Sequence, residues 1–224
     1  MDLNFGEIIV NPVSRAFFDE YDENIQFNQP EIVWSIDEHQ WNHEKSIDHF
    51  VVVEGVNAKK LLKDTVLNGT PKLICKVRKV EIYEVDEATL LCVAEEQDLN
   101  YVASISDLLN TFINKANTAT IISLQRTSDF KADRIPDGCI IRGINSKLDD
   151  VEHLKPPNFV TGVGGAVSSK RLMNSQAFSC YIIYIDIFDK ITVEKILTHL
   201  KRIGLKYDEN VKIQAIQEKS NLYM

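Results

Sequence analysis

Three nearly continuous runs of apolar residues constrain the fold of this chain more than any other feature. They cover residues 50–53, 90–94 and 178–188, and they include many β-branched side chains. A strand that is covered on both faces shows such a run, whereas a half-exposed strand alternates apolar and polar residues. We therefore expect these segments to be inner strands of a sheet that has helices on both faces.

Amphipathic patterns predict helices between and after these strands. Apolar residues recur at helical spacing within residues 104–116 and 192–203. Asn57, Ser104 and Thr192 are placed to act as N-caps, and Gly204 is placed to end a helix. The expected helices cover residues 57–67, 104–116, 166–173, 192–203 and 208–218.

The order of these elements predicts the fold class. Further strands are expected at residues 32–36, 118–124 and 139–141, and the alternation in residues 72–85 fits one long bent strand or a hairpin. Strands separated by helices indicate a single-domain α/β sandwich with a largely parallel central sheet flanked by helices. We expect an acidic N-terminal arm (residues 1–30), an α/β domain (residues 31–218) and a flexible C-terminal tail (residues 219–224).

The negative charge of the chain is concentrated near its beginning. The net charge is −8, and residues 1–54 hold twelve acidic residues but only two basic ones, Arg15 and Lys45. No basic stripe is available to neutralise phosphates, which argues against binding to nucleic acid. We interpret the acidic quarter as a solvated surface, with a docking surface for a basic partner as the alternative.

The lack of a visible secretion signal and the spacing of the cysteines favour a location in the cytoplasm or nucleus. The first residues lack the basic and apolar regions of a secretion signal. The longest apolar run, residues 178–188, is too short to span a bilayer and contains Asp186, so we expect no membrane association. The cysteines lack metal-ligand spacing, so we expect them to be reduced and mostly in the core. They are Cys75, Cys92, Cys139 and Cys180.

Two segments were considered for chemistry. His39 and His43 are four residues apart, but no further ligands accompany them, and a solvated loop is favoured over a metal site. The run Gly162-Val163-Gly164-Gly165 precedes a helix and resembles a phosphate cradle. It lacks the residues that a P-loop or a dinucleotide fingerprint requires, so glycines that allow close packing are favoured. An enzyme that binds a small phosphorylated or nucleoside-like ligand at this run remains the alternative function.

The chain ends in Leu222, Tyr223 and Met224, a hydrophobic-Tyr-X motif that carries a free carboxylate. Such a tail can insert into a pocket of a partner. The carboxylate would pair with a lysine there, and the tyrosine ring would bury apolar area while its hydroxyl finds a polar partner. We predict that these three residues bind a partner protein.

Four stretches of the sequence resemble the proteasome assembly chaperone 1 family. These are Phe5-Gly6-Glu7-Ile8-Ile9, the segment from Pro157 to Ser168, the pair of segments Tyr181-Ile182-Ile183-Tyr184 and Ile191-Thr192-Val193-Glu194, and the end of the chain from Ser220 to Met224. The resemblance is most specific in the last third of the chain. It implies a non-enzymatic chaperone subunit without a nucleotide, metal or other cofactor.

The resemblance also implies the partners. The subunit would form a heterodimer with a second assembly chaperone subunit, and the heterodimer would promote assembly of the proteasome α-ring and core particle. Its tail would dock in a pocket between proteasome α-subunits through Leu222, Tyr223 and Met224. A third interpretation is a scaffold subunit whose tail has no role in binding.

Overall fold

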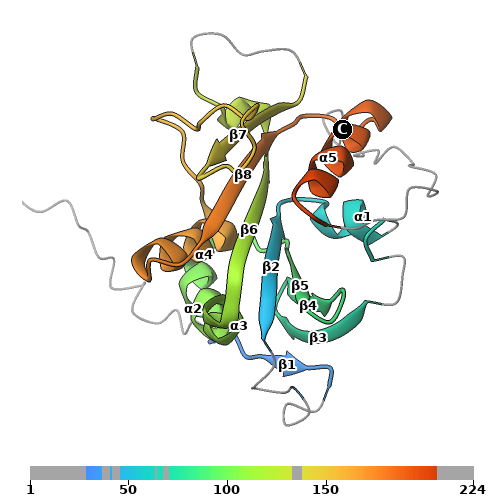
Figure 1. Cartoon of the computed structure of the whole chain (residues 1–224), viewed down its shortest axis with the longest axis vertical. Helices are drawn as coiled ribbons and strands as arrows, with labels where there is room; N and C mark the ends of the chain where they lie inside the picture. The colour runs from blue at the N-terminus through green and yellow to red at the C-terminus, as the bar shows by residue number, and fades with distance from the viewer. Residues whose placement is uncertain are drawn as a thin grey trace, which may run out of the picture.

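The computed structural model describes residues 29–36, 41, 46–63, 65–67, 71–132 and 138–205. An eight-stranded sheet runs through this part of the chain (Figure 1). The strand order is β1-β3-β4-β5-β2-β6-β8-β7. The strands are β1 (Val33–Trp34), β2 (Ile47–Glu54), β3 (Lys72–Val77), β4 (Val80–Glu84), β5 (Thr89–Ala94), β6 (Ala116–Gln125), β7 (Ile140–Ile144) and β8 (Phe178–Tyr184).

The expected α/β fold is confirmed, but the sheet is mixed rather than largely parallel, because only its three central strand pairs are parallel. β2 pairs in parallel with β5 and β6, and β6 pairs in parallel with β8. The outer pairs are antiparallel, because β3 and β4 form a hairpin and β7 returns beside β8. Of the two arrangements expected for residues 72–85, the hairpin is therefore the correct one, with its turn at Arg78 and Lys79. Arg78 adopts the left-handed φ of 52° that such a turn needs.

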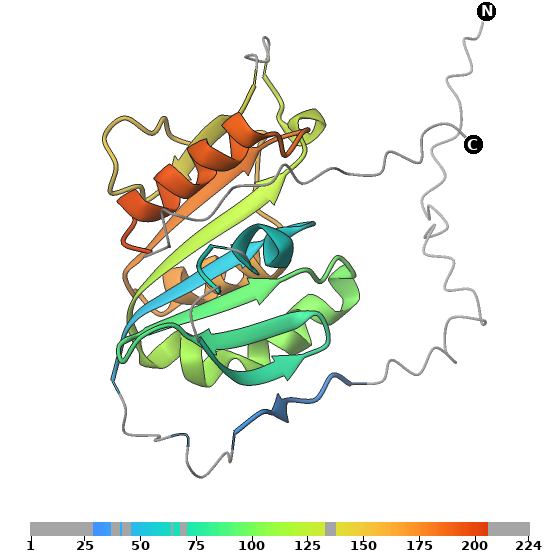
Figure 2. The same ribbon diagram turned by 90° about the vertical axis from the view of Figure 1, so that its right-hand side faces the viewer.

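Helices cover both faces of the sheet (Figure 2). One face packs against α1 (Ala58–Lys63) and α5 (Lys190–Arg202), and the other packs against α2 (Val102–Leu108), α3 (Asn110–Lys115) and α4 (Gly162–Met173). Alternate residues of β2 divide between the two cores, with Phe50 and Val52 in one and Val51 and Val53 in the other. This division explains why the central strands read as continuous apolar runs.

The N-caps differ from those expected at two helices. Ser104 lies inside α2, which begins at Val102. The carboxylate of Asp189, not Thr192, caps α5 by accepting a 2.7 Å hydrogen bond from the Thr192 backbone N–H. Thr192 is therefore the residue that an N-cap side chain reaches. Asn57 directly precedes α1, as expected, with a left-handed φ of 68°, and its carbonyl accepts a hydrogen bond from the Leu61 N–H. α1 ends at Lys63 rather than near residue 67.

Three of the four cysteines belong to the core, as expected. Cys75, Cys92 and Cys180 are buried, Cys139 is half-buried, and none of the four forms a disulfide. Burial raises the pKa of the Cys75 and Cys180 thiols to about 12, so both remain protonated and unreactive near neutral pH.

Gly204, with a φ of 95°, follows α5 at the expected position. The expected helix at residues 208–218, the tail and nearly all of the arm lie outside the described residues.

Candidate functional site

The N-terminus of α4 holds the carboxylate of Glu54. Glu54 is the last residue of β2, and its side chain reaches the first turn of α4. The Val163 backbone N–H donates to Oε1 at 2.6 Å, and the Gly164 N–H donates to Oε2 at 2.8 Å. The free N–H groups and the dipole of a helix N-terminus favour an anion at this position. The run of glycines at residues 162–165 is thus an anion cradle that the chain fills with its own carboxylate.

The glycines of this run are needed because the carboxylate comes so close. A Cβ atom on Gly162 would overlap Glu54 Oε1, and the φ of 70° at Gly162 is itself unfavourable for other residues. A Cβ on Gly164 would lie 2.8 Å from both Glu54 Oε2 and Ile121 Cγ2. Of the two interpretations drawn from the sequence, glycines for close packing and a phosphate cradle, the first is therefore correct. The amide groups that a phosphate would need already donate to Glu54.

Burial makes Glu54 an unusual acid. Its residue surface is 7% exposed, and desolvation raises its pKa from 4.5 to about 7, although the two amide hydrogen bonds act in the opposite direction. The sequence analysis did not single out Glu54. The available signal was an acidic residue placed directly after the apolar run of residues 50–53.

A buried arginine fixes the other end of α4. The guanidinium of Arg171 donates to the carbonyl oxygens of Ile113, Ala116, Asn117 and Ala177 at 2.6–3.0 Å. These carbonyls belong to α3, the start of β6 and the residue before β8. Arg171 has no exposed surface, and burial lowers its pKa from the usual value. The orientation of α4 on the sheet is therefore set by one buried ionisable side chain at each end.

A groove of about 750 Å³ lies at the β7 edge of the sheet, between the segment that follows β6 and the segment that precedes α4. Asn158 joins the two segments, because its side chain accepts from the Lys131 N–H at 2.7 Å and donates to the Lys131 carbonyl at 2.9 Å. The groove is lined by Ser128, Phe130, Lys131, Ala132, Arg142, Glu152, His153, Lys155, Pro156, Pro157 and Asn158. Its walls thus combine cationic, acidic, polar and apolar side chains, and Arg142 and Glu152 form an ion pair.

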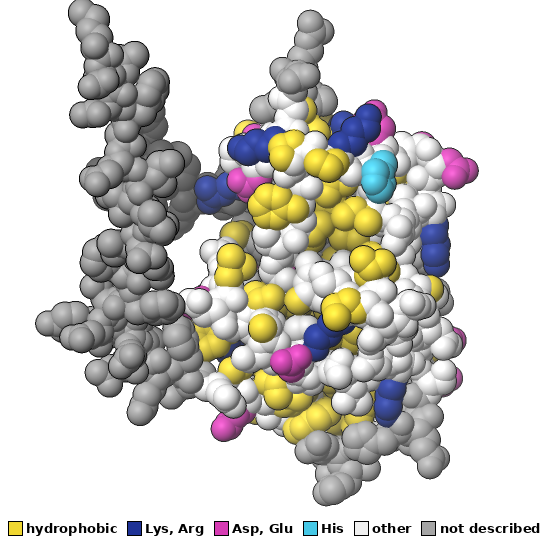
Figure 3. Space-filling model, turned by 90° about the vertical axis from the view of Figure 1, so that its left-hand side faces the viewer, with side chains coloured by type: hydrophobic (Ala, Val, Ile, Leu, Met, Phe, Trp, Pro, Cys, Tyr) yellow, Lys and Arg dark blue, Asp and Glu magenta, His cyan; other side chains and the backbone are white. Residues whose placement is uncertain are grey.

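Apolar side chains also gather on the face of the molecule that carries α4 (Figure 3). Phe159, in the segment before α4, is 69% exposed, and Leu172 and Met173, at the end of α4, are 65% and 83% exposed. Exposed apolar residues in such numbers are typical of surfaces that bind other proteins.

The residues that were expected to bind a partner, Leu222, Tyr223 and Met224, lie outside the described residues, as do His39 and His43. Two of the three histidines within the described part have structural contacts. His49 Nε2 is 2.8 Å from Thr120 Oγ1, and His199 packs against the ring of Tyr181. Among the described residues, no group of three or more His, Cys, Asp or Glu side chains is arranged to hold a metal ion. Within the same residues, no helix has the length and apolarity needed to cross a bilayer.

The segment from residue 68 to residue 186, which includes both α4 and the groove, matches the family model of the POC1 chaperone. The chain belongs to the POC1 chaperone family. The resemblance of the sequence to assembly chaperones is therefore confirmed at the level of the family. A comparison with curated proteins finds no match.

Two solved structures share the fold of this POC1 chaperone family member. A protein of unknown function from Thermoplasma acidophilum is 17% identical with a TM-score of 0.54, and the alignment covers 74% of this chain and 80% of that one. PbaA from Pyrococcus furiosus, an archaeal homolog of proteasome-assembly chaperone, is 15% identical with a TM-score of 0.51. That alignment covers 77% of this chain and 81% of PbaA.

Proposed function

We propose that this chain is a non-enzymatic subunit of a proteasome assembly chaperone and corresponds to proteasome assembly chaperone 1. It forms a heterodimer with a second, similarly folded chaperone subunit and promotes assembly of the α-ring in the cytoplasm or nucleus. The single observation that carries this proposal is the match of residues 68–186 to the POC1 chaperone family. The PbaA-like fold is consistent with it.

The tail provides the mechanism in this proposal. Leu222 fills a hydrophobic notch, the ring of Tyr223 is buried, and the carboxylate of Met224 pairs with a lysine of a pocket between two α-subunits. By occupying such pockets, the chaperone favours the correctly assembled ring and hinders early binding of activators. Since the contacts are made by the end of the chain, the folded domain is needed only to position the tail and to bind the second subunit.

The test is a pull-down of proteasome α-subunits from cell extract. The full chain is compared with a chain that ends at Asn221 and with the single variant Tyr223→Ala. We expect the truncated chain to recover much less of the α-subunits. Tyr223→Ala should lose ~2 kcal/mol or more of binding free energy, as a buried tyrosine hot spot would. Ser220→Ala is the matched control, because Ser220 precedes the motif and should bind as the unchanged protein does.

The outcomes separate the two parts of the proposal. Equal recovery of α-subunits by the full and truncated chains would exclude the tail from the mechanism and favour the scaffold interpretation. Recovery of no α-subunit by any variant, with an unchanged thermal transition of each protein, would refute the role in α-ring assembly itself.

A further inference from the structure

The beginning of the chain and the first part of the sheet carry opposite charges. Residues 1–28, called the acidic segment here, contain six acidic residues and one basic residue, Arg15. Four of the acids, Asp19, Glu20, Asp22 and Glu23, are close together in the sequence. The segment from residue 57 to residue 80 has the opposite composition, with seven basic residues and one acidic residue.

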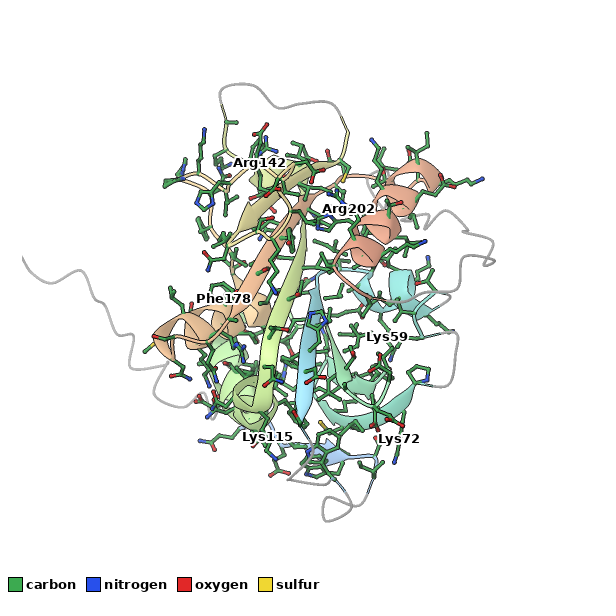
Figure 4. The ribbon with its side chains drawn as sticks, viewed as in Figure 1. Lys59, Lys72, Lys115, Arg142, Phe178 and Arg202 are labelled. Atoms are coloured by element: carbon green, nitrogen blue, oxygen red, sulfur yellow. The ribbon has the colours of Figure 1, made fainter. Side chains whose placement is uncertain are left out.

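Four of these basic residues, Lys59, Lys76, Arg78 and Lys79, line one hollow of the surface, and Lys60 and Lys63 follow Lys59 on the same helix. We name the surface that carries these six residues the basic face. It consists of three residues of α1 and three of the β3–β4 hairpin: Lys59, Lys60, Lys63, Lys76, Arg78 and Lys79. The two elements meet at Glu81 of β4, where Lys59 Nζ lies 2.6 Å and Lys76 Nζ 3.4 Å from the carboxylate. Figure 4 shows Lys59 on the same side of the molecule as β3.

Two carboxylates of this region lie beneath the cations, whereas a third, Glu95, is half-buried and accepts a 3.0 Å hydrogen bond from the Lys59 backbone N–H. Glu81 is 7% exposed, and Glu96, whose carboxylate is 2.7 Å from Arg78 Nε, is 4% exposed. Lys59 and Lys76, by contrast, leave about half of their side-chain surface in solvent, 46% and 50%. The surface that a partner would meet is therefore cationic, even though part of the charge is paired below it.

The residues that follow the acidic segment enter the fold beside this surface. β1 is an edge strand that pairs with β3, and Val33 lies opposite Lys76. Since the pair is antiparallel, the residues before Val33 run toward the Arg78–Lys79 turn. Gln29 is the first residue that the structure describes, and the four clustered acids precede it by six to ten residues. In an extended chain this spacing corresponds to roughly 20–35 Å. That reach is enough to place them on the basic face.

We propose that the acidic segment docks on the basic face of its own chain. The covalent connection supplies a high effective concentration, so weak contacts are sufficient. Individual surface ion pairs contribute little, and salt screens them, so the docking is reversible and sensitive to ionic strength. An acidic surface of a partner protein would compete with the segment for the same six cations.

The test uses a carbodiimide, which joins a carboxylate to a lysine amine that it contacts. The full chain is treated at low ionic strength, and the cross-linked peptides are identified by mass spectrometry. We expect cross-links from Asp19, Glu20, Asp22 or Glu23 to Lys59 and Lys76, with a several-fold lower yield at ~0.5 M ionic strength. A mixture of isotope-labelled and unlabelled protein distinguishes contacts within one chain from contacts between two.

Matched charge reversals test the surface. One variant carries Lys60→Glu, Lys63→Glu and Lys79→Glu, which leaves Lys59 and Lys76 available as cross-linking sites and spares their ion pairs with Glu81. The control carries Lys147→Glu, Lys155→Glu and Lys195→Glu, three exposed lysines that lie outside the basic face. We expect a several-fold loss of cross-links to Lys59 and Lys76 in the first variant only.

Three results would overturn the proposal. These are cross-links that form only between labelled and unlabelled chains, cross-links of the acidic segment spread over lysines outside the basic face, and equal yields from the two variants. The thermal transition of each variant is measured alongside, because reversal of exposed charges should leave the fold intact.

Discussion

At the scale of single residues, Glu54 shows how a local sequence pattern can suggest the right chemistry and the wrong ligand. The glycines at residues 162–165 do form an anion cradle at a helix N-terminus, as their pattern suggests. The anion is a carboxylate 109 residues away in the sequence from Val163. No local pattern specifies so distant a partner, which is why sequence analysis could recognise the cradle but not its occupant.

The raised pKa of Glu54 predicts a specific pH dependence of stability. The folded state binds the proton more tightly than the unfolded state, because the pKa rises from 4.5 to about 7 on folding. The stabilisation is therefore complete below pH ~4.5 and is lost as pH rises through about 7, a change of ~3 kcal/mol in the free energy of unfolding. Urea denaturation of the unchanged protein and of Glu54→Gln, between pH 5 and pH 8, measures this change as the difference between the two curves.

The difference between the curves is needed because histidines act in the opposite sense. Burial lowers the pKa of His199 to about 4, so its contribution to stability is lost as pH falls. Both proteins contain His199, and its effect cancels in the comparison. Glu152→Gln, at an exposed carboxylate, is the control and should follow the unchanged protein. Parallel curves for Glu54→Gln and the unchanged protein would show that Glu54 stays ionised throughout this range.

At the scale of elements, the sequence predicted the strands better than the helix ends. Continuous apolar runs identified the inner strands because burial on both faces leaves no other pattern. Helix starts were misplaced because several polar residues close together can each act as a cap. Asp189 and Thr192 both carry a side-chain oxygen that could cap α5, and only the backbone geometry decides that Asp189 is the cap. The start of α4 was missed because its first turn is rich in glycine, which is a poor helix former.

Arg171 should be the most important polar side chain for the position of α4. Arg171→Met removes four hydrogen bonds and leaves buried carbonyl oxygens without donors, so we expect a loss of ~3 kcal/mol or more in the free energy of unfolding. Arg202→Met is the control, because Arg202 forms an exposed ion pair with Asp150 that should contribute little to stability. Chemical denaturation measures both values, and similar losses in the two variants would contradict the role of Arg171.

At the scale of the whole molecule, the sequence predicted the fold class but not the order of the strands. The order depends on which strands become neighbours after long crossovers, and residues in the strands themselves do not encode this. β2 lies between β5 and β6, and β8 lies between β6 and β7. The partner-binding residues were inferred from the end of the chain, and that inference stays a prediction.

The strand order predicts where the sheet is most resistant to opening. β2, β6 and β8 lie inside the sheet and contribute to both cores, whereas β1 is a two-residue strand at one edge. We expect the amides of β2, β6 and β8 to be the last to exchange in native-state hydrogen exchange, and those of β1 to be among the first. Equal protection of β1 and β6 would show that the sheet opens only as one unit.

The contact between Glu54 and α4 also has a consequence for the order in which the protein is made. A ribosome that synthesises the chain releases β2 long before it reaches Val163 and Gly164, because 109 residues separate Glu54 from Val163. During that interval the Glu54 carboxylate has no N–H groups of a helix N-terminus from which to accept hydrogen bonds. Water must solvate it instead. We therefore expect the contact between β2 and α4 to form only after the second half of the chain has emerged.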